Sequence, residues 1–95
     1  MKTRKFAKDL MLAITEEDAP EGFEIVEEGE WIQDYKYQGR EIIFKFEDKH
    51  YSLYESRSGS YHSDWYYGSE NWSEEVEVYE VEPVEVTTIQ WRAVL

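Results

Sequence analysis

The sequence contains no cysteine, which excludes disulfide bonds, thiolate chemistry and cysteine-rich zinc sites. It also has no apolar run near the roughly 20 residues that a membrane-spanning helix needs. Residues 1–12 lack the pattern of a signal peptide, because the short apolar run from Leu10 to Ile14 is followed by acidic residues and not by a small-residue cleavage site. We therefore expect residues 1–95 to form a single soluble domain in the cytoplasm of the cell, with no membrane partner.

Basic residues are scarce, and their distribution is uneven. Ten Lys and Arg face twenty-two Asp and Glu, which gives a net charge of −12. Residues 1–15 hold four bases and one acid, whereas residues 16–95 hold six bases and twenty-one acids, so the amino end is basic and the remainder carries −15. This charge opposes direct binding to nucleic acid. The aromatic share of 17% argues against disorder, so we expect a folded, acidic protein.

The amino-terminal pattern predicts a helix over about residues 3–18. Phe6, Leu10 and Ile14 recur at four-residue steps, with polar residues on the other face. The charges of this helix would be reversed relative to its dipole, with bases at the amino end and the acids of residues 16–18 at the carboxyl end. Such a helix would have to draw its stability from packing.

After turn-forming residues at 19–22, the pattern changes to the two-residue period of β-strands. The sequence therefore predicts an α+β fold: one N-terminal helix, about 3–18, packed on a twisted antiparallel sheet of about five strands, within about 23–94. The alternation of acidic and apolar residues over 74–82 shifts by one position at Val78 and Tyr79, and this change of parity predicts a β-bulge. Pro83 ends that strand or marks a sheet edge. The expected strands are 23–37, interrupted at Gly29, then 41–47, 51–55, 74–82 and 84–94, with loops at 56–60 and 68–71.

Aromatic residues crowd into the stretch 51–72. Rigid aromatic rings and arginine dominate protein interfaces, so the stretch predicts a partner-binding anchor. The alternative is a small second core beneath a loop. Stacking of unpaired bases is disfavoured, because the basic groove that accompanies it is missing. The predicted anchor residues are Arg57, Tyr61, Trp65, Tyr66 and Tyr67.

Acidic residues alternate with apolar ones near the carboxyl end. Same-face residues of a strand lie about 6.6 Å apart, so such glutamates would present regularly spaced carboxylates. Duplex DNA holds on the order of 18 charges over a length matching this domain, so mimicry of nucleic acid would require most acids to gather on one side. The alternative is that the acids solvate the sheet and protect its edges. The glutamates concerned are Glu75, Glu77, Glu80, Glu82 and Glu85.

The catalytic and metal-binding signals are weak. Ser60, His62 and Asp64 lie at two-residue intervals, but no nucleophile elbow accompanies them. His50, His62 and Asp64 do not have the spacing of a metal motif. We therefore predict a non-enzymatic protein with no cofactor and no metal, and keep a small hydrolase that uses His62 and Asp64 as a minor alternative.

Residues 56–68, SRSGSYHSDWYYG, together with VEPVEV at 81–86 and Trp91, resemble small uncharacterised proteins of tailed phages and prophages of Gram-positive bacteria. The resemblance covers about residues 23–94. The group carries no assigned functional residues, so it implies a setting only: an accessory phage protein inside a bacterial host. In that setting, small acidic phage proteins resemble inhibitors of host nucleic-acid enzymes, including CRISPR nucleases and restriction systems.

These observations lead to one principal hypothesis and one alternative. The protein would bind a basic surface of a host nucleic-acid-processing protein as an anti-CRISPR or anti-restriction inhibitor, with the glutamates supplying the field and the aromatic residues anchoring the contact. The alternative is a phage accessory protein that acts through homo-oligomerisation or through virion or replication-complex contacts.

Overall fold

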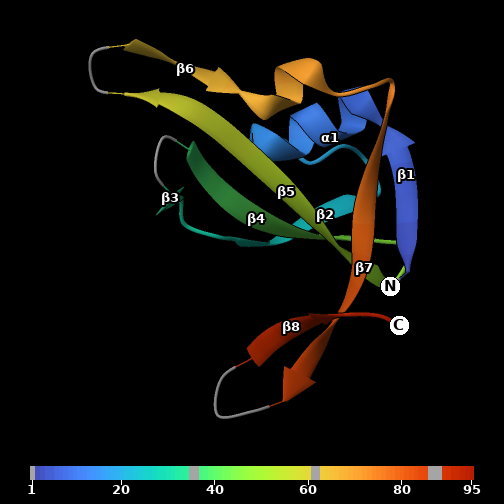
Figure 1. The fold of residues 1–95 in the computed structure, drawn as a ribbon. Coiled ribbons are helices and arrows are strands. Elements are labelled where there is room, and N and C mark those ends of the chain that lie inside the picture. The colour runs from blue at the N-terminus through green and yellow to red at the C-terminus, as the bar shows by residue number, and fades with distance from the viewer. Residues whose placement is uncertain (1, 35–36, 61–62, 86–88) are drawn as a thin grey trace.

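In the part of the chain that the structure describes, one curved antiparallel sheet wraps around a single short α-helix (Figure 1). The computed structural model describes residues 2–34, 37–60, 63–85 and 89–95, and it gives the backbone alone for 34, 60, 63–65, 70 and 85. None of these residues belongs to a helix long and apolar enough to cross a lipid bilayer. The elements are β1 Thr3–Ala7, α1 Lys8–Thr15, β2 Phe23–Glu28, β3 Ile32–Asp34, β4 Tyr37–Phe46, β5 Lys49–Ser60, β6 Ser63–Tyr67, the 3-10 turn η1 Gly68–Asn71, β7 Glu75–Glu85 and β8 Ile89–Ala93.

The eight described strands occupy only five positions across the sheet. β4 and β5 form its centre, and the whole of β4 pairs with residues 49–58 of β5. β2 and β3 both pair with the free side of β4, while β6 and β7 both pair with the free side of β5. β1 and β8 both pair with β7. Three of the five positions are therefore filled by two short strands placed end to end.

The two ends of the chain meet beside Glu80 of β7. The amide of Glu80 donates to the carbonyl of Lys2 at 2.9 Å, and the amide of Val94 donates to the carbonyl of Glu80 at 2.8 Å. The amide of Lys2 in turn donates to the carbonyl of Val94 at 2.7 Å. Because the N–H and C=O of one strand residue point to the same side, β1 and β8 lie along the same edge of β7. Figure 1 shows both termini at this junction.

The predicted α+β fold, a helix over 3–18 on about five strands, is wrong. Residues 3–7 form β1, the helix begins only at Lys8 and ends at Thr15, and the sheet has eight described strands. Pairing with β7 satisfies the backbone of β1 and sets Lys5 opposite Glu77, while Phe6 still enters the core. Arg4 and Lys5 therefore lie outside the helix, which removes most of the reversed charge that the sequence had suggested.

The predicted strand limits also need correction. Residues 56–60 are not a loop but the end of β5, where Gly59 adopts φ 148° beside a register shift in the pairing with β6. The predicted loop at 68–71 is the turn η1. The predicted last strand, 84–94, is divided, because β7 extends to Glu85 and β8 begins at Ile89. This serine-rich sequence forms a strand because β4 pairs with residues 56–58 and β6 pairs with residues 57, 58 and 60.

The parity change in β7 does not arise from a bulge. The register is continuous from Glu75 to Glu85 against three partner strands. Val76 and Val78 are buried on the face that carries α1, whereas Val81 is buried on the opposite face. The apolar pattern changes parity because the two ends of one regular strand bury opposite faces.

Pro83 lies inside β7, opposite Trp91 of β8. The backbone groups of Glu80 point toward β1 and β8, so those of residue 83, three positions on, point toward the β5 side. The described pairing of β5 with β7 ends at His50 and Val81, so β5 offers no carbonyl that an N–H of residue 83 would have to reach. Proline is tolerated here at a local edge, one of the two outcomes that the sequence predicted.

The core lies between the sheet and α1. Met11 and Ile14 of the helix are fully buried against residues of β1, β4, β5 and β7. Phe6 stands at the centre of an aromatic cluster, edge-on to four rings whose centroids lie 5.3–5.6 Å away. These rings belong to Phe23, Phe44, Phe46 and Tyr51.

We expect Phe6→Ala to lower the free energy of unfolding by about 3–5 kcal/mol, because it removes a buried ring from contact with four others. Urea unfolding at equilibrium measures this change. Tyr79→Ala is the matched control, because Tyr79 is half exposed on β7 and should cost less than about 1 kcal/mol. A loss below about 1 kcal/mol for Phe6→Ala would contradict the placement of β1 against the core.

Candidate functional site

The two faces of the sheet differ in charge. We call the face that carries α1 the helix face and the opposite one the outer face; residues paired across two strands share a face. By the pairing registers, the four arginines, Arg4, Arg40, Arg57 and Arg92, all lie on the helix face. Among the described strand side chains, the helix face holds five Lys or Arg and four Glu, and the outer face holds two Lys and five Glu. The outer face is therefore the acidic one.

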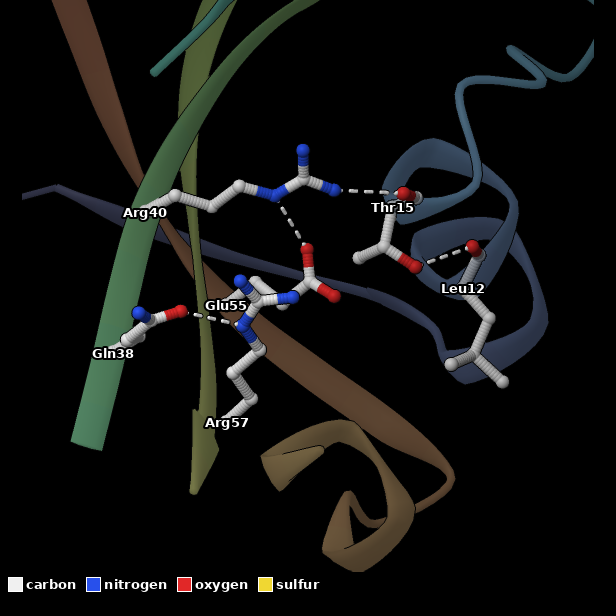
Figure 2. Close-up of polar contacts among 6 residues, drawn as sticks. All are labelled: Leu12, Thr15, Gln38, Arg40, Glu55 and Arg57. Atoms are coloured by element: carbon white, nitrogen blue, oxygen red, sulfur yellow. Dashed lines mark hydrogen bonds and ion pairs between the residues drawn. The ribbon is translucent and has the colours of Figure 1, made fainter. Parts of the chain in front are cut away.

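Polar side chains gather on the helix face in a cavity of about 330 Å³, the arginine pocket. Arg40 of β4 donates from Nε to Oε2 of Glu55 at 2.7 Å, and from Nη2 to the carbonyl oxygen of Thr15 at 2.9 Å (Figure 2). Arg57 of β5 donates from Nε to Oε1 of Gln38 at 2.8 Å. The pocket is lined by Leu12, Thr15, Glu16, Trp31, Arg40, Glu55, Arg57, Tyr67 and Ser69.

Trp31 supplies the aromatic wall of the arginine pocket. The guanidinium carbons of Arg57 and Arg40 lie 4.0 Å and 4.9 Å from its ring centre, within the range of cation–π attraction. Tyr67 contacts the same ring edge-on at 6.4 Å. Both arginines are thus engaged by groups of the chain itself. The pocket joins the carboxyl end of α1 to the sheet, where a cation also suits the helix dipole.

The predicted aromatic anchor is divided between the two faces. Arg57 and Tyr67 pair with each other and lie on the helix face, in the arginine pocket. Tyr66 pairs with Ser58 and lies on the outer face, where it is largely exposed. Tyr61 lies outside the described residues, as does the side chain of Trp65, whose backbone is in β6.

The predicted row of glutamates is also divided. Glu75 and Glu77 are exposed on the outer face. Glu80 and Glu82 lie on the helix face, where Lys49 and Arg92 approach them to 3.9 Å and 2.6 Å. The backbone of Glu85 pairs with Ile89 at the end of β7, and its side chain lies outside the described residues. Two of the five carboxylates thus face solvent together, and two are neutralised by neighbouring bases.

The outer face carries exposed aromatic and aliphatic side chains, of which only Tyr66 was among the predicted anchor residues. We call four of them the tyrosine patch: Ile32, Tyr37, Tyr54 and Tyr66, which are 72%, 63%, 64% and 66% exposed. They come from β3, β4, β5 and β6, and the registers place them around Gly39 and Ser58. The two-residue period of the sequence could have assigned Tyr37 and Tyr54 each to one face of its own strand. Only the pairing register of β4 with β5 shows that the two side chains share a face of the sheet.

The described side chains form no group of three or more His, Asp or Glu that could hold a metal ion. His50, one of the residues considered for such a site, packs against Trp91 with ring centroids 5.0 Å apart. Its partners in that hypothesis, His62 and the side chain of Asp64, lie outside the described residues.

Fold and faces define a small acidic sheet protein with its arginines on one face and exposed tyrosines on the other. The family model described as "Phage T4 Y04K protein" matches residues 1–94, and the chain belongs to this family. It is thus a small phage protein, as the sequence resemblance implied.

A 45-residue stretch is 51% identical to a protein of Enterobacteria phage T4 described as "Uncharacterized 12.6 kDa protein in pin-nrdC intergenic region". The match covers 44% of this chain and 42% of the relative, less than half of the relative's length. No solved structure matches the chain.

We expect Glu55→Gln to destabilise the protein by about 3 kcal/mol, because it leaves the Arg40 guanidinium buried without a counter-charge. The side chains of Arg40 and Glu55 are only 13% and 5% exposed. Glu82→Gln is the control, since Glu82 and Arg92 form an equally short pair whose side chains are 46% and 67% exposed, and it should cost less than about 1 kcal/mol. Urea unfolding compares the two, and equal costs would contradict the role of the arginine pocket.

A second prediction concerns Glu28, which lies on β2 beside the arginine pocket. Partial desolvation and the nearby carboxylate of Glu17 raise the pKa of Glu28 above its ordinary value, and Arg40 opposes them. A raised folded-state pKa lowers stability as pH rises from the unfolded value of about 4.3 through the folded one. We therefore expect Glu28→Gln to raise the melting temperature at pH 7 but not at pH 3.

Thermal unfolding of Glu28→Gln at the two pH values checks this sign. Glu24→Gln is the control, because Glu24 lies on the same strand but opposite Lys45 on the outer face, and its loss should not stabilise the protein at pH 7. A gain for Glu28→Gln that is the same at pH 3 and pH 7 would contradict the prediction.

Proposed function

We propose that this phage protein is a non-enzymatic inhibitor that binds a basic surface of a host nucleic-acid-processing protein and blocks access of DNA or RNA. The observation that carries the proposal is the combination, on one sheet face, of exposed carboxylates with the tyrosine patch. The protein would act as an anti-CRISPR or anti-restriction inhibitor, so the first partners to test are CRISPR nucleases and restriction systems in the cytoplasm of the host. A Gram-positive host stays a prediction.

Charge supports the choice of a basic partner. The net charge of −12 creates a field that speeds encounter with positively charged surfaces and opposes encounter with nucleic acid. The helix face adds little to this field, because three of its four described glutamates lie next to an arginine or Lys49. On the outer face, Glu75 and Glu77 are exposed, with Lys5 opposite Glu77 as a basic neighbour.

Aromatic exposure supports a protein partner. Tyrosine buries a large area at low entropic cost, and it is enriched at binding hot spots. Three exposed tyrosines lie on neighbouring strands of the outer face. In the arginine pocket on the helix face, Trp31 is already packed against Tyr67 and against the guanidinium groups of Arg40 and Arg57. The contact surface of the proposal is therefore the outer face, and it includes Tyr66 of the predicted anchor.

The test uses two double variants in the same strand. Glu75→Gln with Glu77→Gln removes two exposed outer-face charges, and Glu80→Gln with Glu82→Gln removes two charges that are paired with bases. The first step is affinity purification from nuclease-treated host lysate at low and high salt. The purified partner is then assayed for association rate with each variant, and for its own binding to DNA or RNA.

We expect the outer-face double variant to slow association about threefold or more at low salt, and the helix-face double variant to have a smaller effect. The partner should lose binding to nucleic acid in the presence of the wild-type protein. Equal effects of the two variants, or undiminished binding of nucleic acid by the partner, would contradict the proposal. An oligomer in light scattering that dissociates on Tyr54→Ala would instead favour the assembly alternative.

A further inference from the structure

A hollow of about 500 Å³ lies within the tyrosine patch, on the outer face. Its centre is Gly39 of β4, which has no side chain. The neighbours of Gly39 on this face follow from the register: Ile32 is paired with it on β3, Tyr37 lies two residues before it and Glu41 two residues after it. The hollow is lined by Ile32, Tyr37, Gln38, Gly39, Arg40, Glu41 and Tyr54.

The side chain of Tyr54 lies across Gly39. A Cβ atom added to Gly39 would stand 1.9 Å from the Tyr54 hydroxyl oxygen and 2.5 Å from Cζ, far inside contact distance. Glycine therefore lets the ring lie against the backbone of β4. Tyr54 is nevertheless 64% exposed, so most of its side chain is open to solvent. Together, Gly39 and Tyr54 form an aromatic platform at the floor of the hollow.

A carboxylate stands next to this platform. Glu41 is the direct cross-strand partner of Tyr54, and such partners have Cβ atoms about 4.5–5.5 Å apart. The hydroxyl of Ser52 donates to Oε2 of Glu41 at 2.6 Å, which fixes the orientation of an otherwise exposed side chain. Arg40 points to the helix face, where it binds Glu55, so its charge is turned away from the hollow.

We propose that this hollow receives an arginine side chain of a protein partner, with the guanidinium stacked on the Tyr54 ring and paired with the Glu41 carboxylate. The planar guanidinium stacks on aromatic faces and forms directed hydrogen bonds to carboxylates, whereas the lysine ammonium is a compact, strongly hydrated charge. Tyr37 and Ile32 would cover the aliphatic part of the arginine side chain. This inference rests on the proposed function, because it names the group by which a basic partner is recognised.

The probe is a hexa-arginine peptide, with hexalysine as the comparison. Its binding to the full chain is measured by isothermal titration calorimetry and by amide chemical shifts in NMR spectra at fixed ionic strength. We expect the shifts to centre on Gly39, Glu41 and Tyr54, with hexa-arginine bound about threefold or more tightly than hexalysine.

Four variants test the geometry. Tyr54→Phe keeps the ring and should retain binding, while Tyr54→Ala should weaken it about threefold. Gly39→Ala should also weaken binding, because the added Cβ displaces the Tyr54 ring. Glu41→Gln should weaken binding and reduce its salt dependence. Tyr79→Ala is the control on the same face, since Tyr79 lies on β7 opposite Ser52, and it should bind like the wild type.

Equal affinity for the two peptides, or shifts centred on Glu75 and Glu77, would overturn the inference. So would unchanged binding by Tyr54→Ala. A host protein that is still captured and inhibited by Tyr54→Ala would overturn this inference and leave the proposed function intact. Binding of hexa-arginine at Gly39 without any inhibited host protein would leave the inference intact and overturn the proposed function.

Discussion

The structure depends first on the pairing of the basic strand β1 with the acidic strand β7. This pairing inserts Phe6 among four aromatic rings and places α1 directly above the same core. It also brings Lys2 beside Val94, so that the two ends of the chain share one edge of β7. A small protein with one short helix has few other ways to cover the apolar face of a sheet.

The division of charge follows from this arrangement. Covering one face with α1 creates a partly buried region at the helix end, and the arginine pocket fills it with guanidinium groups whose partners are a carboxylate, a helix carbonyl and an indole ring. The arginines are thus held on the helix face, while the outer face carries five of the described glutamates and only two lysines. That distribution, and not the total charge alone, makes the outer face the candidate contact surface.

Part of the fold and little of the candidate site could be predicted from the sequence. Residues 41–46 of the predicted strand 41–47 lie in β4, but β4 begins earlier, at Tyr37, and Glu47 belongs with Asp48 to the turn that follows, where both residues have positive φ. Residues 3–7 were misassigned, because Phe6 fits both a four-residue helical step and a buried strand position. The predicted anchor combined Tyr66 and Tyr67, whose adjacent positions in β6 place them on opposite faces, so only Tyr67 lies beside Arg57 of β5.

The sequence by itself determined the acidic charge, the absence of cysteine chemistry and the predominance of strands, because composition and two-residue periodicity are local properties. Tertiary structure alone decided which strands are neighbours, and therefore that Ile32, Tyr37 and Tyr54 meet around Gly39 while the arginines lie behind them. Register is set by pairing between segments distant in the chain, and a shift of one residue would exchange the two faces.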